Sequence, residues 1–409
     1  MPLEHDDASV LEIDDEAMGV FGAGGSWSGA ELRSRISDFN PENADYDEVP
    51  DPSYQTDGGE PGSYEGVCKA QENPVTFKHV VEGLGTAVTN GSSPTKTALS
   101  KLLDLVHQVA ADEFDGDQAA AGWTTTGGDL AGSGTHNPTG TIGLASFEDS
   151  VNGRYPVRPF TESSDTLTCL MALPKAMVAG NEVHGGLVWP WTLKPSALIS
   201  AGIQFLGESN EQHVRLHGCV ATAKIPTVSR GGLPVFDFSV YAADFDEPSE
   251  TRVAASNAIG SVFKKSEVLI AAYGETAVTE LRANEVEIDL RGAFTPDTDP
   301  NDSSNIWGFS RKPELPTVRV QIPLLPTVVP PAAIDAASYR AAKRDNLNAS
   351  NDMHILVTFG GTPGRQVAFY WPRVRLISWK RTKPGGMAYQ DLTFAPVDGL
   401  TEPLVTLQS

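Results

Sequence analysis

Residues 354–397 read HILVTFGGTPGRQVAFYWPRVRLISWKRTKPGGMAYQDLTFAPV, and this stretch predicts an antiparallel β-meander. Its three extended runs are separated by two turns rich in glycine and proline, at 360–364 and 383–386. The middle run, 366–382, begins with the side-chain period of two that a pleated strand requires. Pro372 interrupts this run, and because proline cannot donate a hydrogen bond to a ladder, it indicates a β-bulge or an edge position.

The composition extends this expectation to the whole chain. The sequence has 409 residues with 39 glycines and 29 prolines, which favours short strands and many turns over helices. Extended runs recur at 214–225 and 235–245, and the turn Ser229-Arg230-Gly231-Gly232 between them predicts a β-hairpin. We therefore expect a mainly β protein with two or three domains, or with one domain that carries large insertions.

One helix is expected, over residues 94–109. Ser93 suits the N-cap position and Pro94 suits the first helical turn. Apolar residues then recur at spacings of three and four, which predicts an amphipathic helix that packs on a sheet. They are Ala98, Leu99, Leu102, Leu103, Val106 and Val109.

The formal charge of −23 is concentrated near the beginning of the chain, where residues 1–66 contain 17 acidic side chains against 2 arginines. An acidic segment interrupted by glycine and proline is typical of disorder. We therefore expect an acidic N-terminal arm, which is either ordered by a partner or a solubilising tail. The expected organisation is the arm at 1–65, a main domain at 66–400 with insertions at about 113–165 and 295–350, and a C-terminal tail at 401–409.

The insertions differ in composition. Residues 112–141 are rich in glycine, threonine and alanine, which predicts a long exposed loop. Residues 313–331 contain six prolines, which predicts an extended connection. A short helix is expected at 334–347.

The three cysteines, Cys68, Cys169 and Cys219, are odd in number and far apart. This pattern favours reduced, buried thiols and a reducing cytosol over a disulfide framework. No apolar run approaches the roughly 18 residues that a membrane span requires, and the first residues do not form a signal sequence. We expect neither an integral membrane protein nor secretion by that route.

Residues 285–290 place three carboxylates, Glu285, Glu287 and Asp289, on one face of a predicted strand whose other face is apolar. Neighbouring carboxylates on a strand face lie about 6.6 Å apart, a spacing that leaves a catalytic pair open. The row is a plain solvated face, a surface selected to be negative, or a set of groups for glycoside hydrolysis or calcium binding.

Six basic side chains and no acidic one lie between Gly364 and Lys383, counting the latter. In a chain of this negative charge we interpret them as a surface that faces a partner. They are Arg365, Arg373, Arg375, Lys380, Arg381 and Lys383.

Other candidate sites lack the required geometry. His213 and His217 lie about 13 Å apart on a predicted strand, so they cannot share one metal ion, even with Cys219 nearby. The glycine-rich stretch 127–140 lacks the Gly-Lys-Ser/Thr ending of a phosphate-binding loop. We assign no catalytic residue, no metal and no cofactor.

Taken together, these elements resemble the tail tube proteins, or major tail proteins, of long-tailed bacteriophages. The resemblance covers about residues 66–399. It lies in the order of the segments along the chain and in their general residue pattern. It rests on the strand at 74–81 that leads into the helix, the block from Gly202-Ile203-Gln204-Phe205-Leu206-Gly207 to His217-Gly218-Cys219, the strands at 235–245 and 286–290, and the closing Tyr389-Gln390-Asp391-Leu392-Thr393-Phe394.

The resemblance implies a β-sandwich with one flanking α-helix and long loop insertions, assembled as homohexameric rings whose inner strands join into a barrel. Stacked rings would form the hollow virion tail tube for genome delivery, assembled in the host cytoplasm around a tape-measure protein and joined to tail terminator and baseplate proteins. Viral DNA would pass without specific binding, and no membrane is implied. An acidic lumen suits this role, because free lysines or arginines would bind DNA phosphates.

On this basis the lumen-facing candidates are Glu285, Glu287, Asp289 and Asp237. The six basic residues between Gly364 and Lys383 are candidates for contacts between subunits, for instance with an acidic arm. The size of the chain also leaves open a trimeric ring of fused tube domains.

Two other classes of function remain. A β-sandwich binding module, such as a capsid decoration or receptor-binding protein, would use Trp189 and Trp191 as its contact, although such residues also serve in cores and interfaces. A carbohydrate-active enzyme would use two of the clustered carboxylates.

Overall fold

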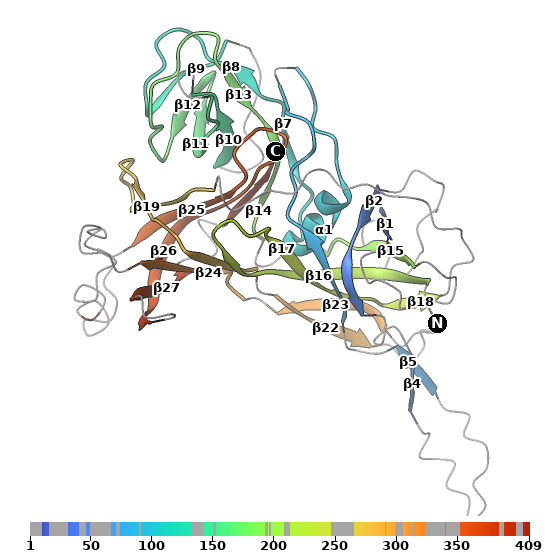
Figure 1. Ribbon diagram of the computed structural model, residues 1–409. Coiled ribbons are helices and arrows are strands. Elements are labelled where there is room, and N and C mark those ends of the chain that lie inside the picture. Colours follow the sequence, from blue (N-terminus) through green and yellow to red (C-terminus); the bar gives the residue numbers. More distant parts are fainter. Residues whose placement is uncertain are drawn as a thin grey trace, which may run out of the picture.

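The computed structural model confirms the expected class, because its described residues form large antiparallel sheets and one α-helix (Figure 1). The structure describes residues 10–15, 32–40, 46–49, 67–70, 74–89, 91–131, 142–149, 153–192, 195, 198–207, 213–246, 266–290, 292–298, 306–312, 314–323, 340, 352–383, 388–397 and 404–409.

The main sheet contains 18 strands. They are β1 (Val10–Asp15), β2 (Leu32–Arg35), β3 (Ser37–Asn40), β6 (Val75–Val80), β7 (Asp112–Phe114), β14 (Gly186–Pro190), β15 (Ala201–Leu206), β16 (Val214–Ser229), β17 (Val235–Tyr241), β18 (Asp244–Asp246), β19 (Val268–Ala272), β20 (Thr279–Glu280), β21 (Glu285–Leu290), β24 (Thr317–Pro323), β25 (Met353–Phe359), β26 (Val367–Thr382), β27 (Tyr389–Pro396) and β28 (Val405–Gln408).

A second sheet has six strands, and two hairpins stand apart from both sheets. The six strands are β8 (Asp117–Gln118), β9 (Gly127–Asp129), β10 (Gly143–Phe147), β11 (Val157–Ser163), β12 (Thr166–Cys169) and β13 (Glu182–His184). The hairpins are β4 (Tyr46–Val49) with β5 (Val67–Ala70), and β22 (Ala293–Thr298) with β23 (Ile306–Lys312).

The long strand β16 organises the main sheet. Its first half pairs with β15 and β18, and its second half pairs with β17 and β21. From there the strands continue in the order β6, β17, β16, β21, β24, β27, β26, all antiparallel. We call these seven strands the central sheet. The β16–β17 pair confirms the predicted hairpin.

The predicted meander is confirmed as β25, β26 and β27. Met353 pairs with Val374 but Ile355 pairs with Trp371, so β26 carries one additional residue at Pro372, which is the expected bulge. Both faces of the segment before this bulge, residues 367–371, are buried. Phe369 and Trp371 join the main core, whereas Tyr370 packs in a second cluster with residues of the six-stranded sheet.

The helix α1 (Ala98–His107) begins later than expected, with Thr97 and not Ser93 as its N-cap. Thr97 and Ser100 form a capping box, in which each side chain bonds the backbone N–H of the other residue. The predicted apolar face is confirmed, since Leu99, Leu102 and their helical neighbours lie in the main core. At the other end, Arg311 from β23 donates to the carbonyl oxygens of Val106, His107 and Thr192.

Three expectations about segments outside the meander are wrong. Strands β1, β2 and β3, assigned to an acidic arm, pair with β15 and β6 of the main sheet. Strand β24 lies in the middle of the central sheet, although it falls in the proline-rich stretch, because Pro316 precedes its first residue and Pro323 is its last. The expected tail at 401–409 contains β28, which pairs with both β14 and β26.

The expected insertion at 113–165 is also more ordered than a loop. Its described parts supply β8 to β11, and with β12 and β13 they enclose a small core around Phe147, Phe160 and Val183. Glycine and threonine favour loops in a sequence, but here they lie in short strands such as β9 and β12. The helix expected at 334–347 lies outside the described residues except for Arg340.

Two of the cysteines, Cys169 and Cys219, are buried and form no disulfide. Burial raises the pKa of the Cys169 thiol to about 12, so this group is an unreactive core residue. Cys68 lies in β5, where side chains are not described.

His107 is fully buried at the end of α1, between the rings of Trp189 and Trp191. Neither ring nitrogen has a hydrogen-bond partner among the described residues. Burial, with a smaller effect of the nearby Arg311 charge, lowers the pKa of His107 to about 3.

We predict that this histidine makes the fold sensitive to acid. Below pH 6.5 the unfolded chain binds a proton at His107, whereas the folded chain does so only near pH 3, so falling pH favours the unfolded state. In this window His107→Phe should reduce the pH dependence of the free energy of unfolding by about 1.4 kcal/mol per pH unit. Urea titrations from pH 7 to pH 4 measure it, with exposed Leu233→Ala as control; equal slopes in His107→Phe and wild type would refute the prediction.

Candidate functional site

The four lumen-facing candidates lie on one face of the central sheet. In β21 the residues alternate between partly exposed and buried, so Glu285, Glu287 and Asp289 share the outer face. Asp237 in β17 lies opposite Lys224 in β16, and Lys224 lies opposite Asp289 on its other side. This side of the central sheet faces away from the main core, and we call it the polar face.

Each of these acidic strands is flanked by basic side chains. Arg319 in β24 contacts Glu287 at 3.0 Å and also binds Asp391 in β27 through two hydrogen bonds, of 2.7 and 2.8 Å. These hydrogen bonds, first those to Asp391, raise the pKa of Arg319 above its ordinary value. Arg319 therefore pairs with carboxylates from both neighbouring strands, which neutralise its positive charge.

The same compensation occurs at both ends of the polar face. The Lys224 ammonium lies 3.8 Å from the Asp237 carboxylate. Asp237 is also opposite Lys78, and Asp391 is opposite Lys380. Arg375 of β26 also lies on this face by register and binds Asp352. Apart from that pair the face carries five acidic and four basic side chains, which leaves an excess of a single negative charge. The acidic residues are Asp237, Glu285, Glu287, Asp289 and Asp391, and the basic residues are Lys78, Lys224, Arg319 and Lys380.

A hollow of about 330 Å³ lies on the polar face between β16, β17 and β21. Asp237, Asp289 and Glu314 line it together with Lys224. No group of three His, Cys, Asp or Glu side chains in the described part of the chain has a geometry that could hold a metal ion. Asp237, Glu287 and Asp391 form ion pairs with basic side chains of neighbouring strands.

The basic candidates do not form one patch. Arg373 and Arg375 both bind Asp352, with nitrogen–oxygen distances of 2.8 and 2.6 Å. The Asp352 side chain is only 1% exposed, so these two guanidinium groups stabilise a buried carboxylate. Arg373 also lies over the ring of Tyr273.

The other four basic candidates are exposed but lie at opposite ends of β26. Arg365 is in the turn before β26, whereas Lys380, Arg381 and Lys383 are at or just beyond its other end. A strand of 16 residues extends about 50 Å. Lys380, Arg381 and Lys383 lie close together at the far end, although Lys380 and Arg381 project to opposite faces of the strand.

Several residues of this site were missed from the sequence. The alternation of Val318, Val320 and Ile322 with Arg319 and Gln321 was a strand signal, but the flanking prolines led to a prediction of an extended connection. Asp352 gave no local signal, because it binds arginines more than 20 residues away.

The remaining candidates are structural. Trp189 and Trp191 are buried, with 0 and 4% of their surface exposed, and Trp189 donates to Asp104 at 2.6 Å. Cys219 lies in the main core, and His217 contacts Asp246 at 3.2 Å. A Ser34–His79 contact of 2.6 Å has the form of a nucleophile and base, but both residues are buried and burial lowers the pKa of His79 to about 4.

Comparison with known proteins adds no family. No protein-family model matches the chain, and no curated protein matches it. In the part of the chain that the structure describes, no helix is long and apolar enough to cross a membrane. The fold and this face define the class as a mainly β protein with a two-sided antiparallel central sheet, one side apolar and the other charged.

We predict that Asp352 is a stabilising residue. Asp352→Ala should lower the free energy of unfolding by about 2–4 kcal/mol, because two half-buried guanidinium groups lose their partner. As a control, Lys312→Ala removes an exposed contact with Glu314 and should cost about 0.5 kcal/mol or less. Urea denaturation measures both; a loss at Asp352 no larger than that of the control would show that Arg373 and Arg375 are available for other contacts.

Proposed function

We propose that this chain is a structural subunit that assembles with copies of itself and presents the polar face to an internal channel. The observation that carries the proposal is the polar face itself. Seven antiparallel strands present charged and hydroxyl side chains outward, and the basic ones occupy register positions beside carboxylates. A surface of this kind is hydrated but leaves few free cations.

More particularly, we propose a tail tube protein of a long-tailed bacteriophage. In this role the subunits form rings, hexameric or trimeric with fused domains, that stack into the virion tail tube around a tape-measure protein. Tail terminator and baseplate proteins would be its further partners. Support comes from the mainly β fold with one flanking helix, which matches what the sequence resemblance implies.

The charge pairing suits a conduit for DNA. Each free lysine or arginine that neutralises a phosphate adds to affinity, and many such contacts along a tube would retain the polymer. Arg319 is held by Asp391 and Glu287, and Lys224 lies between Asp237 and Asp289. A channel wall whose basic side chains are paired with carboxylates, and which keeps a slight negative excess, lets DNA pass without binding it. The proposed lumen is therefore less acidic than the sequence alone implies.

The two other classes lose their specific support. A binding module that uses Trp189 and Trp191 requires exposed rings, but both are buried. A glycosidase that uses Glu287 requires a carboxylate free to act as acid, base or nucleophile, but Arg319 holds it. We therefore propose a non-enzymatic role.

We predict that the purified chain forms rings or hollow tubes of uniform bore. Negative-stain microscopy over a range of concentrations measures this directly. Discrete monomers or closed oligomers without a channel at high concentration would refute the tube. Hydrolysis of an oligosaccharide that is lost in Glu287→Gln would instead establish the enzyme.

We also predict that adding positive charge to the polar face creates DNA binding. Glu285→Lys places a lysine at the end of the carboxylate row, repeated in every subunit of an assembly. Assembled Glu285→Lys should bind double-stranded DNA in 50 mM salt and release it in 0.5 M salt, whereas wild type should not bind. The control is Glu275→Lys, an exposed position away from the polar face; equal binding by both variants would contradict the lumen assignment.

A further inference from the structure

One end of the central sheet has an excess of basic side chains. A single cross-strand row runs through Ser229, Glu285, Gln321, Asp391 and Lys380. The row crosses five strands, so it is about 20 Å long. The segments that continue past the row toward the same end carry the basic residues Arg230, Arg282, Arg381 and Lys383.

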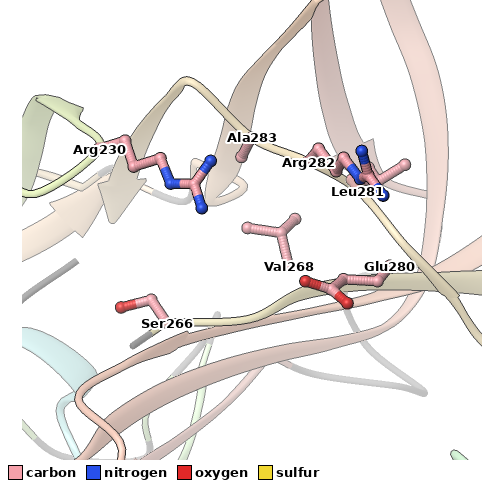
Figure 2. A pocket seen from close by; sticks show the side chains of 7 residues that line it. All are labelled: Arg230, Ser266, Val268, Glu280, Leu281, Arg282 and Ala283. Atoms are coloured by element: carbon pink, nitrogen blue, oxygen red, sulfur yellow. The ribbon is translucent and has the colours of Figure 1, made fainter. Parts of the chain in front are cut away.

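A hollow of about 400 Å³ opens at this end, between the β16–β17 turn and the segment that joins β20 to β21. Figure 2 shows Arg230 reaching over the hollow, with Glu280 on the opposite wall and Arg282 beside Leu281. Val268 and Leu281 give the hollow an apolar part. Both arginines are exposed, and neither forms an ion pair with a described residue. We call this site the arginine hollow.

An acidic segment leaves the sheet at the opposite end. Strand β6 begins at Val75, which pairs with Val240, and ends at Val80, which pairs with Val235 beside the β16–β17 turn. Residues 41–73 therefore join β3 to β6 at the end far from Arg230. This segment contains nine acidic residues and one lysine. Its β4–β5 hairpin projects away from the sheets (Figure 1).

We propose that the β4–β5 hairpin of one copy docks at the arginine hollow of a second copy. Carboxylates bind the planar guanidinium group through paired hydrogen bonds. The hollow carries two guanidinium groups, those of Arg230 and Arg282, and one carboxylate, that of Glu280. The hairpin and the arginine hollow lie toward opposite ends of the central sheet, so the contact is head-to-tail and repeats without closing on a pair. The choice of a second copy as occupant rests on the proposed self-assembly.

Charge reversal tests the contact in the full chain. Arg230→Glu/Arg282→Glu should weaken association between copies about tenfold or more, measured by sedimentation at low and high salt. Asp47→Arg/Glu48→Arg in the hairpin should do the same. An equimolar mixture of the two variants should recover association, which also shows that both are folded. Lys175→Glu, an exposed change in the loop between β12 and β13, is the control; equal association in all variants would overturn the docking.

A peptide separates this inference from the proposed tube. The peptide of residues 42–52, Glu-Asn-Ala-Asp-Tyr-Asp-Glu-Val-Pro-Asp-Pro, should bind the full chain by fluorescence anisotropy. Binding should fall about tenfold in Arg230→Glu/Arg282→Glu and in a peptide whose acids are replaced by their amides. Tubes without peptide binding and without an effect of the arginine variant would overturn the docking alone. Peptide binding without rings or tubes would support the docking and overturn the tube.

Discussion

The strict alternation of side chains across the central sheet is the constraint on which the rest of this structure depends. Along β21 and β24 each inward residue is a buried valine, isoleucine or leucine, and each neighbour lies on the opposite face. A slip of one residue in any pair would move carboxylates into the core and valines to the surface. The apolar core therefore sets the register, and the register sets which charges meet on the polar face.

Strands distant in sequence complete this arrangement. Strand β28 joins β14 to β26, and its Gln408 side chain accepts from Ser100 and lies beside the Thr97 N-cap of α1. Arg311 closes the other end of the helix through its last carbonyl oxygens. Buried polar groups that meet in this way are costly to separate, because each would be left without a partner. The helix is thus positioned by residues more than 200 positions away.

Local patterns predicted the parts of the fold in which one segment carries its own signal. The meander, the bulge at Pro372, the β16–β17 hairpin and the apolar face of α1 all follow from spacing and turn residues. The patterns failed where tertiary contacts overrode composition. Strand β1 is acidic, but Val10, Leu11 and Ile13 are buried against the core, and Glu12 binds Arg33 from β2. The composition of β1 alone does not show that half of its side chains are buried.

The sequence by itself determined that this chain is mainly β, that Glu285, Glu287 and Asp289 share a strand face, and that its negative charge is unevenly distributed. Only the tertiary structure decided what those carboxylates face. Arg319 lies 32 residues from Glu287 and 72 from Asp391, and the three meet because β24 lies between β21 and β27. Strand order arises from the packing of the whole core, which local periodicity does not contain. For this reason a row that reads as acidic in sequence is nearly neutral on the folded surface.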